Sequence, residues 1–204
     1  RQVVVEAGGA GQVAGGQVGV GGGPVEVEQV GDLVLGDRLQ IDLLDRPLAA
    51  KAKLGFIPDR PFVYDKLTGG EFLRFAAALY GQQGATVERR IDELLELFEL
   101  APWKGELTEN YSHGMRQKLI ICGAFVHRPE LIVVDEPMVG LDPKSARLLK
   151  DLFRQFVDRG GTVLMSTHTL EVAEVMCDRI AIVYRGKVAA QGTLAELREQ
   201  TASG

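Results

Sequence analysis

The sequence of 204 residues lacks several features that would mark common protein classes. It has no run of about 18 apolar residues, so we expect no segment of it to span a membrane. Its two cysteines, Cys122 and Cys177, have no paired spacing, which excludes a disulfide scaffold and a Cys-based zinc site and fits a reducing cytosol. With 28 acidic against 23 basic residues there is no basic field for nucleic acid, and no secretory signal is visible. We therefore expect a soluble, cytoplasmic protein without a nucleic-acid partner.

The N-terminal quarter differs from the rest in composition. Residues 1–55 contain no aromatic side chain, the first lysine is Lys51, and glycine is dense between residues 8 and 36. Because glycine loses much entropy on ordering and packs no side chain, we expect only weak strands here, over 24–30 and 32–35, at an edge of the sheet. The chain also begins with Arg, which is consistent with a fragment or a misassigned start. We predict an anomalous Gly/Val-rich segment over residues 1–46 and a separate domain over 47–204.

From about residue 54 onward, short apolar runs alternate with amphipathic segments. This alternation predicts an α/β protein with a parallel sheet covered on both faces. The expected strands are 54–57, 131–134, 162–166 and 180–183, with 187–191 pairing back onto the last of them, and the expected helices are 71–80, 87–100, 112–126, 143–157 and 194–199. In the first of these helices, Phe72, Phe75, Ala76 and Leu79 fall on one face and predict a buried side.

The most informative motif is LIVVDEP, at residues 131–137. It ends an apolar strand in two carboxylates, Asp135 and Glu136, at the edge of a sheet where α/β proteins bind ligands. Asp135 could hold Mg²⁺ and Glu136 could polarise the water that attacks a γ-phosphate. The alternative is that both acids are solvated and cap the following turn.

Two further segments point toward the same edge. Ser112 is suited to cap the helix that follows it, which would place the amides of His113 and Gly114 at a positive helix end able to bind phosphate. His168 follows the expected strand 162–166. The end of this strand and the end of the strand before Asp135 and Glu136 are expected to face the same crevice. A Ser cap that binds nothing and a structural histidine are the plainer alternatives.

Four segments follow one another in the chain: GFIPDRPF, NYSHGMRQK, LIVVDEPMVGLDP and STH. Together they resemble the ATP-binding subunit of an ABC transporter, and their residues are most similar to those of the ABC-2-type exporter branch. The resemblance covers about residues 47–200. It implies a P-loop NTPase-like (RecA-like) parallel sheet core with an inserted helical subdomain at about 64–112. It also implies ATP with Mg²⁺ and a nucleotide-sandwich dimer.

By this resemblance the motif residues take specific roles. Asp135 orders the metal, Glu136 is the general base and His168 is the switch histidine at the γ-phosphate. Ser112, His113 and Gly114 form the signature that contacts the nucleotide of the opposite subunit. Asp142 is the interface aspartate of the dimer, and Asp59 stands where the family has glutamine.

The same resemblance implies the partners. These are a membrane-spanning permease subunit touched by the helical subdomain and a second ATP-binding subunit, identical or different. The chain would then hydrolyse ATP to drive export, peripherally on the inner face of the cell membrane.

One family feature is missing from the chain. The phosphate-binding loop G-x-x-x-x-G-K-S/T does not occur, because no Gly-Lys-Ser or Gly-Lys-Thr exists in the sequence. Two explanations are open: a degenerate nucleotide site, or a shifted reading frame or misassigned start over the first 45 or so residues. The alternative functions are a non-hydrolysing subunit that dimerises with an intact partner, and a soluble ABC-type ATPase.

Overall fold

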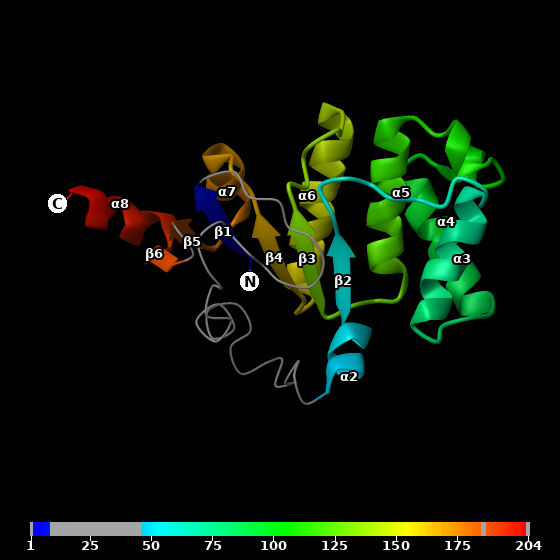
Figure 1. Cartoon of the computed structure of the whole chain (residues 1–204), viewed down its shortest axis with the longest axis horizontal. Coiled ribbons are helices and arrows are strands. Elements are labelled where there is room, and N and C mark those ends of the chain that lie inside the picture. Colours follow the sequence, from blue (N-terminus) through cyan, green and yellow to red (C-terminus); the bar gives the residue numbers. More distant parts are fainter. Residues whose placement is uncertain (1, 9–45, 185–186, 203–204) are drawn as a thin grey trace.

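The computed structural model describes residues 2–8, 46–184 and 187–202. Its centre is a six-stranded sheet in the order β2-β3-β4-β1-β5-β6 (Figure 1). All neighbours are parallel except β5 and β6, which form an antiparallel hairpin. The strands are β1 (Gln2–Gly8), β2 (Leu54–Ile57), β3 (Leu131–Asp135), β4 (Thr162–Ser166), β5 (Arg179–Tyr184) and β6 (Lys187–Gly192). The predicted α/β fold class and the predicted parallel pairing of β3 and β4 are confirmed.

The position of β1 corrects one prediction. A strand from the first 45 residues was expected at an edge of the sheet, but β1 lies inside it, between β4 and β5. Its register pairs Val5 with Ser166 on one side and with Ala181 on the other. The backbone of this segment completes the sheet's hydrogen bonding. The strands predicted over 24–30 and 32–35 lie outside the described residues.

Helices cover the sheet and extend beyond its β2 side. The helices are α2 (Pro47–Ala52), α3 (Gly69–Leu79), α4 (Ala85–Leu97), α5 (His113–Val126), α6 (Pro143–Asp158), α7 (Leu170–Met176) and α8 (Leu194–Ala202), with short 3₁₀ turns at Ala101–Trp103 and Thr108–Asn110. Helices α3 and α4 pack on α5 at the end of the molecule away from α8 (Figure 1). Helix α5 in turn packs on β2, and α6 packs on β4.

Local sequence explains where three of these helices begin. Thr68 and Glu71 form a reciprocal capping box at α3, in which each side chain accepts from the other residue's backbone N–H. Ser112 caps α5, and Asp142 caps α6 directly before Pro143, whose missing N–H costs nothing in the first turn. The predicted cap Ser112 therefore sets the start of α5, whereas the cap by Asp142 at α6 was not predicted.

The buried face of α3 differs from the predicted one. Phe72 is buried as expected, but Leu79 is 69% exposed and Phe75 is 40% exposed. Leu73 and Ala77 are fully buried instead. The apolar stripe was placed about one position off, because apolar side chains occur on both sides of this short helix.

The core lies between the sheet and the helices α5 and α6. Its fully buried side chains include Ile132 of β3, Met165 of β4, and Leu149 and Phe153 of α6. This contiguous core fixes β3 and β4 side by side. Within the described residues, no helix is both long and apolar enough to cross a bilayer.

Candidate functional site

Two carboxylates stand where β3 ends, at the carboxyl edge of the sheet. Asp135 is the last residue of β3, and its register partner on β4 is Ser166. The Ser166 hydroxyl donates a short hydrogen bond to Asp135 Oδ1. This contact orients the carboxylate. An oriented, partly exposed carboxylate offers the hard oxygen donor that Mg²⁺ prefers.

Glu136 sits in a constrained turn beyond the strand. Its φ of 44° lies in the left-handed region that non-glycine residues rarely adopt. The backbone is held there by hydrogen bonds from Glu136 N–H to Ser166 O (3.0 Å) and from Val139 N–H to Glu136 O (3.1 Å). The turn directs the Glu136 side chain to the segment that follows β4.

The Glu136 carboxylate and the segment after β4 are joined by three hydrogen bonds. Oε1 accepts from the backbone N–H of His168 at 2.7 Å and lies 2.6 Å from His168 Nδ1. Oε2 accepts from the Thr167 hydroxyl at 3.1 Å. The side chain of Glu136 is 20% exposed and that of His168 is 75% exposed. The structure therefore brings Glu136 and His168 together at a solvent-facing edge, with Asp135 next in sequence to Glu136.

A second group of predicted residues lies at the start of α5. The Ser112 hydroxyl accepts from Met115 N–H at 3.3 Å, as its predicted role as a cap requires. Gly140, with a φ of 78°, lies so close to His113 that a Cβ there would be 2.5 Å from His113 Nε2. A Cβ on Gly114 would be 3.3 Å from the Gly140 carbonyl oxygen. The start of α5 thus packs on the loop that links Glu136 to α6.

Asp142 connects this loop to α5 and α6. Its carboxylate accepts from Ser145 N–H (3.0 Å) and from the Ser145 hydroxyl (2.6 Å), and it lies 3.4 Å from Lys118 Nζ. The Ser145 hydrogen bonds, then the Lys118 charge, hold the pKa of the Asp142 carboxyl well below its usual range. Asp142 is therefore an anion that ties α5 to the start of α6.

Asp59 is the predicted residue that stands apart. It follows β2, which pairs with β3, so it belongs to the same edge of the sheet as Asp135. Its side chain lies 3.9 Å from neighbouring Arg60. The structure gives Asp59 no hydrogen bond to the other predicted site residues that it describes.

The sequence motifs missed three contributors. The motif Ser-Thr-His predicted a role for its histidine alone, although the hydroxyls of Ser166 and Thr167 donate to Asp135 and Glu136. Lys118 was not singled out, although it lies beside Asp142. The signal for the first two was present, because Ser-Thr-His places two hydroxyls directly at the end of β4.

No metal cluster exists in the described part of the chain. No three His, Cys, Asp or Glu side chains there are grouped as a metal site requires. Asp135 alone would therefore need oxygen ligands from a bound phosphate to hold Mg²⁺ firmly.

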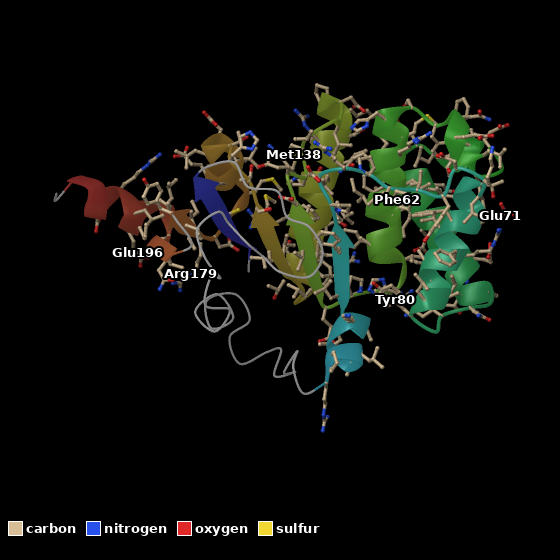
Figure 2. All side chains as sticks on the ribbon, viewed as in Figure 1. Phe62, Glu71, Tyr80, Met138, Arg179 and Glu196 are labelled. Atoms are coloured by element: carbon tan, nitrogen blue, oxygen red, sulfur yellow. The ribbon has the colours of Figure 1, made fainter. Side chains whose placement is uncertain are left out.

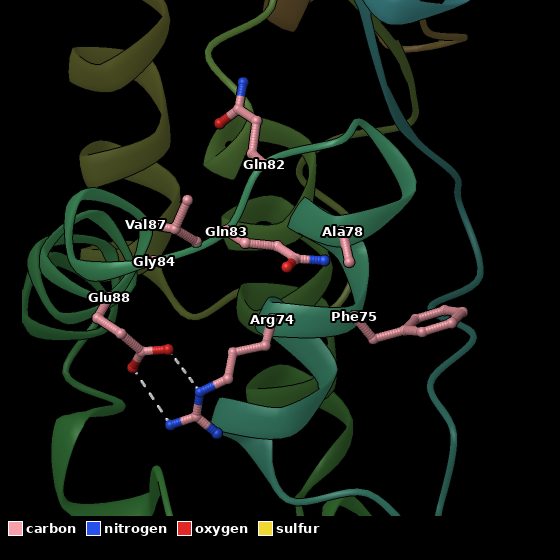
Figure 3. A pocket seen from close by; sticks show the side chains of 8 residues that line it. All are labelled: Arg74, Phe75, Ala78, Gln82, Gln83, Gly84, Val87 and Glu88. Carbon is pink, nitrogen blue, oxygen red and sulfur yellow. Dashed lines mark hydrogen bonds and ion pairs between the residues drawn. The ribbon is translucent and has the colours of Figure 1, made fainter.

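A separate hollow of about 380 Å³ lies between α3 and α4 (Figure 3). Arg74 and Glu88 form a bidentate ion pair in it, at 2.6 and 3.2 Å. This pair satisfies both charged groups that line the hollow. The hollow shares no lining residue with the edge that carries Glu136 and His168.

Exposed aromatic side chains form a surface beside α3, which we call the aromatic surface: Phe62, Tyr64 and Phe75. Tyr64 stacks edge-on with Phe62 at 5.5 Å and with Phe75 at 5.4 Å. Phe62 is 70% exposed and stands at the helical end of the molecule (Figure 2). Clustered exposed aromatics of this kind are typical of a protein contact.

Comparisons with known proteins place these features in a family. The model of the family described as "ABC transporter" matches residues 26–139, more than half of the chain. The chain is 38% identical over 146 residues to the uncharacterized ABC transporter ATP-binding protein YthP of Bacillus subtilis. The aligned region covers 72% of this chain and 62% of YthP.

Two further comparisons agree. The chain is 36% identical over 162 residues to the daunorubicin/doxorubicin resistance ATP-binding protein DrrA of Streptomyces peucetius, covering 79% of this chain and 49% of DrrA. A solved ATP-binding subunit of an ABC transporter superposes with a TM-score of 0.78 and 30% identity, covering 98% of this chain and 82% of that one. The chain thus spans less than two thirds of the length of the two curated relatives.

Proposed function

The chain belongs to the ABC transporter family of ATP-binding domains, and we propose that it is the energy-coupling subunit of a membrane exporter, hydrolysing ATP in a nucleotide-sandwich dimer. The family predicted from the motifs is confirmed, and so is the P-loop NTPase fold. The observation that carries the proposal is the contact of Glu136 with His168 beside Asp135, at the carboxyl edge of a parallel sheet.

In the proposed reaction, Glu136 is the general base. A water oxygen attacks the γ-phosphorus while the bond to the bridging oxygen breaks and ADP leaves with the electron pair. The water proton passes to Glu136 Oε1, the oxygen that contacts His168 in this structure. The His168 ring, which is 75% exposed, would turn from Glu136 toward the γ-phosphate. Mg²⁺, held by Asp135, neutralises phosphate charge when it is bound.

The start of α5 would serve the nucleotide of a second subunit. Ser112 and the amides at His113 and Gly114 present N–H groups and a positive helix end to an anion. Asp142 and Gly140 hold the adjoining loop against this helix end, which supports a coupling between the two sites of a dimer. Asp59 would lie beside the metal and phosphate, as an oxygen donor with a negative charge.

The aromatic surface is the proposed contact with the permease. It lies within the proposed helical subdomain, at about residues 64–112, or directly before it. Its three exposed rings offer apolar area to a helix of the membrane partner, and Tyr64 adds a hydroxyl that can hydrogen-bond. The export direction is favoured by the similarity to DrrA, whose name describes drug resistance. The chain would then be cytoplasmic and bound to the inner face of the membrane through its permease.

A second candidate is a subunit that assembles but does not hydrolyse ATP itself. It is favoured by one observation, the absence of a phosphate-loop lysine: no lysine precedes Lys51 in these 204 residues. Such a chain would lend Ser112 and Gly114 to the nucleotide of an intact partner. The two candidates differ in whether Glu136 matters for turnover.

The deciding experiment is ATP hydrolysis by the complex of this chain with its permease and second ATP-binding subunit. Glu136→Gln should lower kcat by about a hundredfold, since base removal typically costs 10²–10⁴. The matched control is Glu96→Gln, an exposed acid of α4, which should leave kcat unchanged. Turnover that survives Glu136→Gln supports the non-hydrolysing subunit, and ATPase activity without any permease association supports a soluble ATPase.

A further inference from the structure

The Thr167 hydroxyl is placed between the base and the helix that follows it. Thr167 Oγ1 lies 3.1 Å from Glu136 Oε2, and it accepts the backbone N–H of Thr169 at 3.1 Å. Thr169 is the residue that precedes α7. One hydroxyl thus connects the turn after β3 to the start of α7.

The two contacts settle the direction of the hydrogen bond to Glu136. The amide of Thr169 can only donate, so it occupies a lone pair of the Thr167 oxygen. The hydroxyl proton is then free to point at the carboxylate, which as an anion only accepts. A hydroxyl donating to an ionised carboxylate makes a strong, charge-assisted hydrogen bond.

Burial separates Thr167 from the other residue that holds the base. Thr167 is 3% exposed, whereas the His168 side chain is 75% exposed. The ring of His168 can therefore turn into solvent or toward a phosphate while Thr167 stays in place. Of the two side chains on the Glu136 carboxylate, Thr167 supplies the fixed contact.

We propose that Thr167 is a positioning residue for Glu136: its hydroxyl holds Oε2, so that Oε1 faces the attacking water when the His168 ring turns away. Thr167 keeps its proton throughout, and the water proton goes to Oε1. The backbone N–H of His168 stays on Oε1 and prevents the carboxylate from rotating the other way. This inference rests on the proposed role of Glu136 as general base.

The test compares three variants in the assembled complex. Thr167→Val keeps the shape and removes the hydroxyl, and we expect kcat to fall about tenfold to thirtyfold with KM for ATP within about twofold. Thr167→Ser keeps the hydroxyl and should restore kcat to within about threefold of the parent. A Thr167→Val complex with unchanged kcat would overturn the proposal.

A double-variant cycle separates positioning from a loss of structure. In Glu136→Gln there is no base to position, so adding Thr167→Val should not lower the residual single-turnover rate further. If the second change lowers that rate by the same tenfold to thirtyfold, Thr167 supports the loop and not the base. Failure of Thr167→Ser to rescue would lead to the same rejection.

A measurement without turnover keeps this inference distinct from the proposed function. If the parent complex hydrolyses no ATP, the proposed function fails, and the ¹⁵N–¹H resonance of the His168 amide in the full 204-residue chain becomes the readout. We expect Thr167→Val to shift that resonance by more than the same change does in a Glu136→Ala chain, where only the effect of the neighbouring side chain remains, and we expect Thr167→Ser to return it. An unshifted resonance in Thr167→Val refutes the positioning role.

Discussion

Gly55 offers a sharp test of how α5 is held against the sheet. It lies in β2 facing α5, and a Cβ there would be 2.4 Å from the carbonyl oxygen of Ala124 and 2.6 Å from Cδ1 of Ile132. The first of these atoms belongs to the backbone of α5, so relieving the clash requires a shift of the helix itself. Glycine at this position lets the helix and the strand approach closely.

The magnitude of Gly55→Ala follows from two opposing effects. In an open strand position, alanine would stabilise by about 0.4–1 kcal/mol through the unfolded chain. Overpacking of a buried site costs about 1–3 kcal/mol, and a backbone neighbour places the cost in the upper part of that range. We expect a net loss of about 1–2 kcal/mol, which for a chain of this size lowers the melting temperature by roughly 2–8 °C.

The assay is thermal unfolding followed by circular dichroism, with Gly105→Ala as the matched control. A Cβ at Gly105 meets nothing within 4 Å, and its φ lies outside the left-handed region, so we expect its melting temperature to stay within about 2 °C of the parent. If Gly55→Ala also melts at the parent temperature, the close packing of α5 on β2 is wrong. The position that the structure gives to Ser112, at the start of α5, would then be wrong as well.

Three further predictions concern charge and burial. Asp142→Ala should lower the melting temperature at pH 7, and this difference from the parent should shrink below about pH 4. The reason is that a carboxyl with a depressed pKa stabilises the fold above its unfolded pKa and loses that effect as the pH falls. A difference independent of pH would contradict the Ser145 and Lys118 contacts. The Cys122 thiol, whose pKa burial raises, should resist iodoacetamide in the folded chain and react in urea, and rapid labelling of the native chain would refute its burial. The 204-residue chain should bind ATP about tenfold to a hundredfold more weakly than a chain with the phosphate-loop lysine, since one charge-assisted contact is worth about 1.5–3 kcal/mol; micromolar binding by calorimetry would show that another residue replaces the lysine.

Much of the fold could be predicted because apolar runs and caps are local signals. The apolar run over residues 131–134 predicted a buried strand, which the structure extends to Asp135, and Ser112 caps the start of α5 as predicted. The sequence predicted no strand over Gln2–Gly8, which forms β1, and favoured strands from this segment only at an edge, because a Val-rich run followed by many glycines has no periodicity that marks the centre of a sheet. The inner position depends on long-range pairing with β4 and β5, which no local pattern reveals.

The site was predictable to the same extent. Glu136 and His168 follow adjacent parallel strands, so their meeting at one edge could be deduced from spacing and topology. The left-handed turn at Glu136 could not, because nothing in Asp-Glu-Pro marks a positive φ. Thr167 was missed since a hydroxyl at a strand end is common, and only the folded distances reveal its two partners.

The most direct test of the central claim is to locate Mn²⁺–ATP on the chain by paramagnetic broadening of its amide resonances, which detects even weak binding. We expect the amides of Glu136 and His168 to broaden first and those of the distant Gly160 turn to stay sharp. Asp135→Asn or omission of ATP should remove the effect. Broadening that is centred elsewhere, or that survives Asp135→Asn unchanged, would contradict the assignment of this edge of the sheet as the nucleotide site.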